Sequence, residues 1–239
     1  MHVGTVDLPT RVDREKYFRE LRYLELSALF AGPLKPSALA SWAAVAPADA
    51  LGLVAPFPLT HRRPPKGNKL WKHDASTGEF RDSTLAREAF AAVNEAAAAL
   101  HARCIVFRSP ESFSPSAANR ERLQQFFSEV APAGVVERVW VPGGLWELRA
   151  AVKLATELGV TCAIDPLSRA PGDPIEATFD LEAASLYIRV ERAGALGPAR
   201  LDDLADVIEH YGDRRLAIAL ATPNRWQDAR ALQKLLNDR

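Results

Sequence analysis

The 239-residue sequence lacks several features that define common protein classes. Its two cysteines, Cys104 and Cys162, lie far apart in apolar segments, so they form neither a disulfide framework nor the paired ligands of a zinc site. No apolar segment approaches the roughly 20 residues that cross a bilayer. The N-terminus has no basic region followed by an apolar core, as a signal peptide would. We therefore expect a cytoplasmic protein that does not associate with membranes.

Net charge is also absent, because 30 lysines and arginines balance 30 aspartates and glutamates. This balance argues against a protein that wraps nucleic acid over its whole surface, although it is compatible with a local basic patch. Such a patch lies in LTHRRPPKGNKLWKHD, residues 59–74, where no acidic residue stands between His61 and His73. We call residues 61–73 the basic loop. Its cations are Arg62, Arg63, Lys66, Lys69 and Lys72.

What the sequence does have is a regular alternation of short β-rich segments with helical patterns. The strand candidates are residues 2–8, 23–28, 50–55, 104–108, 137–141, 161–165, 185–190 and 216–221. Apolar residues three or four apart indicate helices over residues 13–21, 35–46, 83–102, 116–130, 144–159, 199–212 and 224–238.

Eight such alternations in about 240 residues predict an α/β fold, a TIM-like (β/α)8 barrel that forms a single domain over residues 1–239. An open, doubly wound sheet is the alternative. Two connections are irregular. A long loop follows the third strand (residues 56–82), and the sixth connection (residues 166–183) contains three prolines.

Polar side chains recur on one face of two predicted strands. Glu25 shares its face with Tyr23, and Arg189 shares its face with Tyr187 and Glu191. Because the apolar face must contact the helices, this polar face is expected to point into the barrel. A buried isolated charge is costly, so we expect Glu25 to pair with Arg189, either as a structural ion pair or as part of a ligand site.

Further candidates stand at the carboxyl ends of predicted strands, where the active sites of barrels lie. Arg108 ends the fourth strand, Asp165 ends the sixth, and His61 and Arg62 follow the third. Asp165 precedes Pro166 and could equally anchor a turn. Of the five histidines only His61 is placed to join a site, and neither His-x-His nor Gly-x-Ser-x-Gly occurs. We therefore predict no metal and no cofactor.

Two segments resemble a known family. LELSALFAGPLKPSALASWAAVAPADALGLVAPFPLTH (residues 24–61) and FRSPESFSPSAANRERLQQFF (residues 107–127) are similar to segments of the YecE-like family, domain of unknown function 72. The matching residues are Glu25, Pro36, Ser37, Trp42, Ala55, Pro56, Leu59, Thr60, His61, Pro110, Ser112 and Phe113. The resemblance implies a TIM-like barrel, and the family lends no established activity.

The sequence departs from the family pattern at several polar positions. Ser27 stands in place of Asn, Val54 in place of Lys, Arg108 in place of Gln and Glu191 in place of His. The fifth strand, WVPGGLW, has lost its charged residues and keeps Trp140 and Trp146, and ALAT replaces an Asn pair in the eighth. The resemblance therefore indicates a divergent member, in which any catalysis of typical members need not be retained.

Three functions are compatible with these residues. The first is binding, with or without catalysis, of a small phosphorylated or carboxylated molecule at the carboxyl end of the barrel, beneath the basic loop as an anion-attracting lid. The second is nucleic-acid or nucleotide binding by the basic loop and Trp71. The third is a degenerate barrel that acts as an interaction scaffold. The pattern gives no oligomeric state, and the basic loop could also be a solvated surface loop.

In the first hypothesis each candidate has a role. His61 transfers a proton or donates a hydrogen bond, and Glu25 orients Arg189 or acts as a base. The expected ligand-binding residues are Arg62, Arg108, Trp140, Asp165, Arg189 and Glu191.

Overall fold

The computed structural model describes residues 1–66, 71–168, 181, 183, 185–212 and 214–239. Most of the sixth connection, whose irregular path is predicted above, lies outside the described residues, as do Lys69 and its neighbours in the basic loop. Within the described ranges, no helix has the length and apolar content that crossing a bilayer requires.

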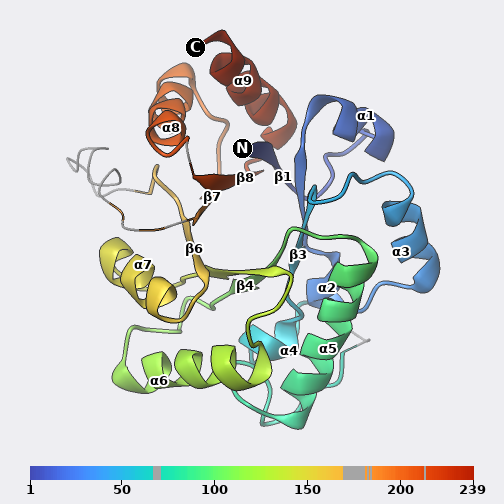
Figure 1. The fold of residues 1–239 in the computed structure, drawn as a ribbon, viewed down its shortest axis with the longest axis vertical. Coiled ribbons are helices and arrows are strands. Elements are labelled where there is room, and N and C mark those ends of the chain that lie inside the picture. Colours follow the sequence, from blue (N-terminus) through green and yellow to red (C-terminus); the bar gives the residue numbers. More distant parts are fainter. Residues whose placement is uncertain (67–70, 169–180, 182, 184, 213) are drawn as a thin grey trace. The chain divides into compact units, whose positions relative to one another are not determined.

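Eight parallel strands form a closed barrel in chain order (Figure 1). They are β1 (His2–Val6), β2 (Tyr23–Leu26), β3 (Leu51–Val54), β4 (Cys104–Arg108), β5 (Glu137–Val141), β6 (Thr161–Ile164), β7 (Ser185–Glu191) and β8 (Arg215–Ala221). Each strand lies within two residues of its predicted position. The predicted TIM barrel is confirmed, and the open-sheet alternative is wrong.

Each predicted helical segment contains a helix. These are α1 (Arg14–Glu20), α3 (Pro36–Ala43), α5 (Thr84–Ala99), α6 (Ala117–Gln125) continued by a π-helix η1 (Phe126–Val130), α7 (Leu148–Glu157), α8 (Pro198–His210) and α9 (Arg225–Asp238). Two short helices, α2 (Ala28–Ala31) and α4 (Phe57–Thr60), follow β2 and β3. A four-residue helix is too short to show a 3.6-residue period, so the apolar pattern does not indicate them.

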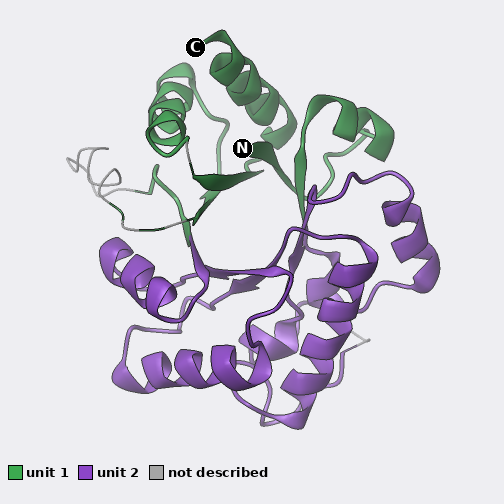
Figure 2. Ribbon diagram, viewed as in Figure 1, with its two compact units in different colours: residues 1–25, 163–239 green, residues 26–162 purple. Residues whose placement is uncertain are grey.

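The chain divides into two compact units (Figure 2). Unit 1 comprises residues 1–25 and 163–239, and unit 2 comprises residues 26–162. In unit 1, β1 pairs with β2 and β8, and β7 pairs with β6 and β8. In unit 2, β4 pairs with β3 and β5, and β5 pairs with β6. The boundaries between the units fall inside β2 and β6.

In unit 1, the buried side chain of Tyr17 connects the first helix to two strands. Asp13 caps α1 by accepting a hydrogen bond from the N–H of Lys16 (2.8 Å), which sets the start of the helix. Tyr17, fully buried on this helix, donates its hydroxyl proton to the carbonyl of Tyr23 (2.6 Å) and accepts from the N–H of Thr5 (2.8 Å). Burial raises the pKa of Tyr17 above its ordinary value. The phenol thus ties α1 to both β1 and β2.

Candidate functional site

The predicted pair between Glu25 and Arg189 is confirmed in unit 1. The Nε of Arg189 donates to both carboxylate oxygens of Glu25, at 3.1 and 3.2 Å. Both side chains are withdrawn from solvent, with exposed fractions of 5% for Arg189 and 0% for Glu25. Glu191, two residues along β7 and therefore on the same face, forms a second ion pair with Nη1 of Arg189.

Two tyrosines complete this network. The alternation of side chains along β2 and β7 predicts that they share a face with Glu25 and Arg189, but it indicates no role for them. The hydroxyl of Tyr187 donates to Glu25 Oε2 at 2.6 Å. The hydroxyls of Tyr23 and Tyr187 are 2.8 Å apart. Because the single proton of Tyr187 is directed to Glu25, Tyr23 must be the donor in that second bond. The order of donation is therefore Tyr23 to Tyr187 to Glu25.

The electrostatics of this network favour a charged but compensated arginine. Burial lowers the pKa of Arg189, whereas Glu25 and Glu191 raise it by more, so its net pKa lies above the ordinary value. Among the described residues, the guanidinium of Arg189 faces two carboxylates, so these contacts leave no excess positive charge to attract an anion. This supports the structural alternative for Glu25, Arg189 and Glu191 over a role in ligand binding.

Asp165 anchors a turn, as one of its two predicted interpretations states. It follows β6, and its Oδ1 accepts a hydrogen bond from the N–H of Leu167 at 3.0 Å. Its Oδ2 also lies 3.6 Å from Nη2 of Arg192. Burial raises the pKa of the Asp165 carboxyl, and Arg192 and backbone N–H groups oppose that effect. The turn explains this residue without a ligand.

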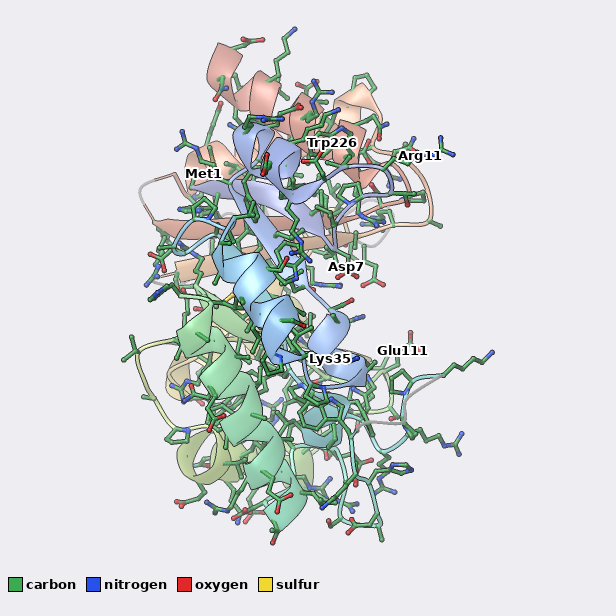
Figure 3. The ribbon with its side chains drawn as sticks, turned by 90° about the vertical axis from the view of Figure 1, so that its right-hand side faces the viewer. Met1, Asp7, Arg11, Lys35, Glu111 and Trp226 are labelled. Carbon is green, nitrogen blue, oxygen red and sulfur yellow. The ribbon has the colours of Figure 1, made fainter. Side chains whose placement is uncertain are left out.

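Asp7 is a residue at a strand end that the sequence analysis did not single out. In Figure 3, β1 runs from Met1 toward Asp7, and Asp7 and Arg11 lie beyond the carboxyl end of the strand. Both have left-handed backbone conformations, with φ of 56° and 66°. The N–H of Asp7 donates to the carbonyl of Glu25 at 2.8 Å, which holds this turn on β2. Aspartate adopts this region more readily than most residues, so the turn positions Asp7 without assigning it a function.

In unit 2, His61 and Arg108 occupy the carboxyl ends of two paired strands. Val54 of β3 lies opposite Val106 of β4, and Arg108 ends β4. After β3 the chain forms α4 and then His61, whose Nδ1 lies 2.7 Å from the hydroxyl oxygen of Thr60. The sequence therefore brings a histidine and an arginine to the same end of neighbouring strands.

The imidazole of His61 is held in its neutral form. Burial lowers its pKa, and the positive charge of Arg108 lowers it further, to about 4. The ring also packs edge-on against Phe30, with 5.0 Å between ring centroids. A histidine with this pKa is a weak base at neutral pH, because proton transfer is most efficient when the pKa is near the working pH. The surroundings favour hydrogen bonding over proton transfer.

Trp140, expected to contact a ligand, is fully buried at 0% exposure. Its Nε1–H donates to the hydroxyl of Ser109 at 2.8 Å, and its ring contacts Trp146 edge-on at 4.9 Å. Trp146 in turn donates to the carbonyl of Phe113 at 2.7 Å. These contacts join the segments that follow β4 and β5. The buried Trp140 therefore packs between these segments and does not present its ring to a ligand.

The basic loop is clamped at its base. The N–H groups of Gly78, Glu79 and Phe80 donate to the carbonyls of the last three residues of α4, at 2.8–3.0 Å. Gly78 has φ of 80°, and a Cβ on it would lie 2.3 Å from the carbonyl carbon of His61. Within the loop, Trp71 packs back and donates to the carbonyl of Leu29 at 2.9 Å. These backbone contacts hold the segment that follows the basic loop against α4, next to His61.

Arg62, predicted to bind a ligand, forms an ion pair with Glu79 at 2.7 Å. It is therefore not an isolated cation of the basic loop. In the described part of the chain, no group of three or more His, Cys, Asp and Glu is placed to hold a metal ion.

Comparisons with known proteins identify the fold. No protein-family model and no curated protein matches the sequence. A DUF72 family protein from Enterococcus faecalis V583 matches with a TM-score of 0.70 at 12% identity, over 99% of this chain and 95% of that one. A DUF72 family protein from Thermotoga maritima MSB8 matches with a TM-score of 0.68 at 16% identity, over 99% and 98%. The chain has the fold of these DUF72 proteins.

More distant barrels share only the general architecture. Endonuclease IV from Thermus thermophilus matches with a TM-score of 0.53 at 12% identity, over 91% of this chain and 88% of that one. At these identities the comparisons establish the fold and transfer no activity. The resemblance to the DUF72 family that the sequence indicates is confirmed at the level of the fold.

Proposed function

We propose that this protein binds a small oxyanion, a carboxylate or a phosphate, beside Arg108 at the carboxyl ends of β3 and β4. The observation that carries the proposal is the position of Arg108 and His61 at the carboxyl ends of the paired strands β3 and β4. Burial lowers the pKa of His61 most, and the positive charge of Arg108 lowers it further, which indicates a positive potential beside the imidazole. Such a potential favours a negatively charged ligand.

The position within the fold supports the same conclusion. Barrel proteins bind their ligands at the carboxyl ends of the strands, in the loops that follow them. His61 and Arg108 follow or end two strands that are paired in register. In this proposal Arg108 holds the anion through charge-assisted hydrogen bonds, and neutral His61 donates one more. No catalytic step is proposed, because the low pKa of His61 suits it poorly to be a base.

The nucleic-acid alternative draws on the basic loop, but its support is weaker. Arg62 is paired with Glu79, and the indole N–H of Trp71 is engaged with the carbonyl of Leu29. A stacking platform for bases requires an aromatic face open to the strand. The scaffold alternative draws on the loss of polar residues from the fifth and eighth strands and predicts that no small anion binds at all.

A thermal-shift screen followed by calorimetry tests the proposal. Phosphate, citrate, pyruvate and a short oligonucleotide are screened against the wild type, and the strongest small anion is titrated into Arg108→Gln and His61→Gln. We expect Arg108→Gln to weaken binding by about ten- to a hundredfold, since a hydrogen bond between charged groups contributes roughly 1.5–3 kcal/mol. The control is Arg87→Gln, an arginine whose charge is balanced by Asp82, and it should bind as the wild type does.

Two results would overturn the proposal. If no small anion raises the melting temperature, the scaffold alternative is favoured. If the oligonucleotide binds with an affinity that falls steeply with salt while Arg108→Gln has no effect, the protein is a nucleic-acid binder.

A further inference from the structure

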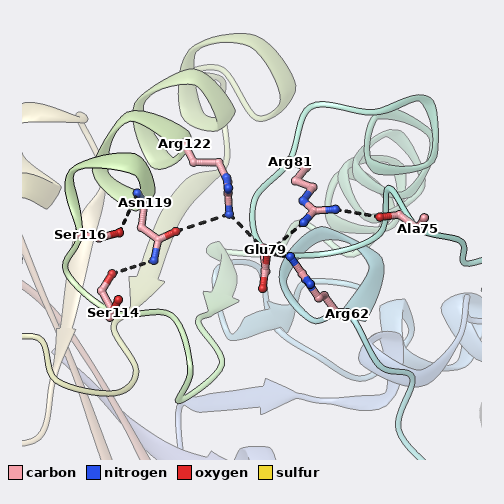
Figure 4. A network of polar contacts seen from close by, with 8 residues as sticks. All are labelled: Arg62, Ala75, Glu79, Arg81, Ser114, Ser116, Asn119 and Arg122. Atoms are coloured by element: carbon pink, nitrogen blue, oxygen red, sulfur yellow. Dashed lines mark hydrogen bonds and ion pairs between the residues drawn. The ribbon is translucent and has the colours of Figure 1, made fainter.

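Three arginines of unit 2 converge on a single carboxylate oxygen (Figure 4). The Oε2 of Glu79 lies 2.7 Å from Nη2 of Arg62, 3.2 Å from Nη2 of Arg81 and 3.3 Å from Nη1 of Arg122. The arginines come from the start of the basic loop, from the segment before α5 and from α6. Segments distant in the sequence thus bring three guanidiniums to one point.

The charges at this point do not balance. The arginines also bond to neutral acceptors, since Arg122 contacts the amide oxygen of Asn119 at 3.4 Å and Arg81 donates to the carbonyl of Ala75 at 2.8 Å. Among the contacts that the structure describes here, one negative charge therefore faces three positive charges. By this count of direct contacts, the three guanidiniums carry two more charges than the carboxylate supplies.

A neighbouring ion pair shows what a balanced arrangement looks like. Arg87 meets Asp82 through two parallel bonds, from Nε to Oδ1 at 2.8 Å and from Nη2 to Oδ2 at 2.7 Å. One guanidinium and one carboxylate satisfy each other there in the bidentate geometry that this pair prefers. The cluster at Glu79 departs from this geometry because a single oxygen serves three donors.

The backbone, rather than the arginines, sets the position of Glu79. Glu79 and Phe80 both have φ of 55°, in the left-handed region that non-glycine residues seldom adopt. The turn is held because the N–H groups of both residues donate to carbonyls of α4, and because the buried ring of Phe80 packs on Phe113 and Phe126, with centroids 5.1 and 5.3 Å away. Strained backbone of this kind concentrates at binding sites.

The guanidiniums are also within reach of solvent. The exposed fractions of the side chains are 58% for Arg62, 29% for Arg81 and 32% for Arg122, against 19% for Glu79. An incoming anion can therefore contact the arginines without opening the core.

We propose that this cluster is a second binding site, for an oxyanion with two negative charges such as the phosphate group of a phosphomonoester. A dianion together with Glu79 supplies three negative charges to three guanidiniums, and each guanidinium can donate two bonds to phosphate oxygens. A phosphodiester carries one negative charge and leaves the cluster unbalanced, which favours a small phosphorylated molecule over nucleic acid. Its residues differ from those proposed to bind an anion beside Arg108, although Arg62 directly follows His61 in the chain.

The test is a titration of inorganic phosphate into wild-type protein, Arg122→Gln, Arg81→Gln and the control Arg87→Gln. Loss of Arg122 or Arg81 should weaken phosphate binding about tenfold, and loss of Arg87 should not change it. Phosphate should bind more tightly as its second proton leaves, at roughly pH 6–7, whereas sulfate, a dianion throughout, should show no such rise. Urea unfolding of each variant verifies that it is folded.

Glu79→Gln provides an independent test because it removes the competing negative charge. If the cluster takes up anions, this variant binds phosphate more tightly than the wild type. Equal phosphate affinity of the wild type and Arg122→Gln, or weaker binding by Glu79→Gln, would overturn the proposal. Arg108→Gln is titrated separately, so that a loss confined to that variant assigns phosphate to the first site and rejects the second. Binding of an oligonucleotide but not of phosphate would also reject it.

Discussion

The two units use the same chemical groups in opposite proportions. In unit 1 the buried guanidinium of Arg189 faces two carboxylates, Glu25 and Glu191. In unit 2 the carboxylate of Glu79 faces three guanidiniums, and Arg108 places a further positive charge near His61. The ratio of charges separates an arrangement that holds the protein together from one that can receive a ligand.

Burial differs in the same direction. Glu25 and Arg189 are at most 5% exposed, whereas the arginines around Glu79 are 29–58% exposed. A buried charge must be neutralised within the protein, because its desolvation is costly. An exposed one is partly stabilised by water and can exchange that water for an anion. Unit 1 is therefore expected to respond to mutation through stability, and unit 2 through affinity.

The largest effect is expected from Glu25→Gln. This change removes the buried counter-charge of Arg189 and leaves it only the exposed carboxylate of Glu191, because arginine cannot release its proton. We expect the free energy of unfolding to fall by about 3–5 kcal/mol. Urea unfolding of the single variants and of the double variant Glu25→Gln with Arg189→Met measures it.

The double variant is also the control for that prediction. Removing both partners should cost less than the sum of the single changes, because neither charge is then left alone. Additive effects would contradict the structural interpretation. If phosphate restored the free energy of unfolding of Glu25→Gln, Arg189 would be shown to accept an anion. The proposed difference between the two units would then be wrong.

The Glu25–Arg189 pair was predictable, and the cluster at Glu79 was not. Because side chains alternate across a strand, the sequence shows that the polar residues of β2 share one face, as do those of β7. Because an unpaired buried charge is costly, Glu25 and Arg189 are then expected to form an ion pair. Tyr23 and Tyr187 lie on the same face as these residues, but a phenol is uncharged, so its burial does not predict an ion-pair partner. The positions of the eight strands followed from a different signal, the short β-rich segments that alternate with helical patterns.

Glu79 has no such signal. It lies in a loop, and its contacts depend on a left-handed turn at Gly78–Phe80 and on α6 being brought beside that turn. Neither a positive φ at a non-glycine residue nor a contact between loops can be read from a local pattern. The sequence therefore indicated an excess of cations in the basic loop, but gave no sign that Arg62 is partly neutralised.

A smaller effect is expected in the pH dependence of unit 2. The pKa of His61 is lowered from 6.5 to about 4 in the folded protein. Between these two pH values the unfolded chain therefore binds a proton at His61 that the folded protein does not bind, which lowers the free energy of unfolding. Its contribution to stability is present in full above pH 6.5 and is lost as the pH falls to about 4. Allowing for partial solvent screening, the loss is about 1–3 kcal/mol.

Urea unfolding at several pH values between about 4 and 8 measures this effect. The difference in stability between wild type and His61→Gln should change with pH in that window, in favour of the variant at the acidic end. A constant difference would show that Arg108 and burial do not perturb His61, and it would remove the electrostatic support for an anion site at β3 and β4.

The smallest effect concerns the cations of the basic loop outside the cluster. Lys66 and Lys72 are exposed, and if they draw anions toward unit 2, reversing both to Glu should weaken phosphate binding about two- to threefold at low ionic strength. The effect should vanish in high salt, because the Debye length then falls below the distance between these lysines and the bound anion. The matched control reverses Lys153 and Lys234, exposed lysines of α7 and α9, which changes the net charge by the same amount without touching the loop. Calorimetry at low and high salt distinguishes the cases. Equal affinities of the loop variant and the control would make the loop an ordinary solvated surface, and the capacity for anions would then reside in the arginines alone.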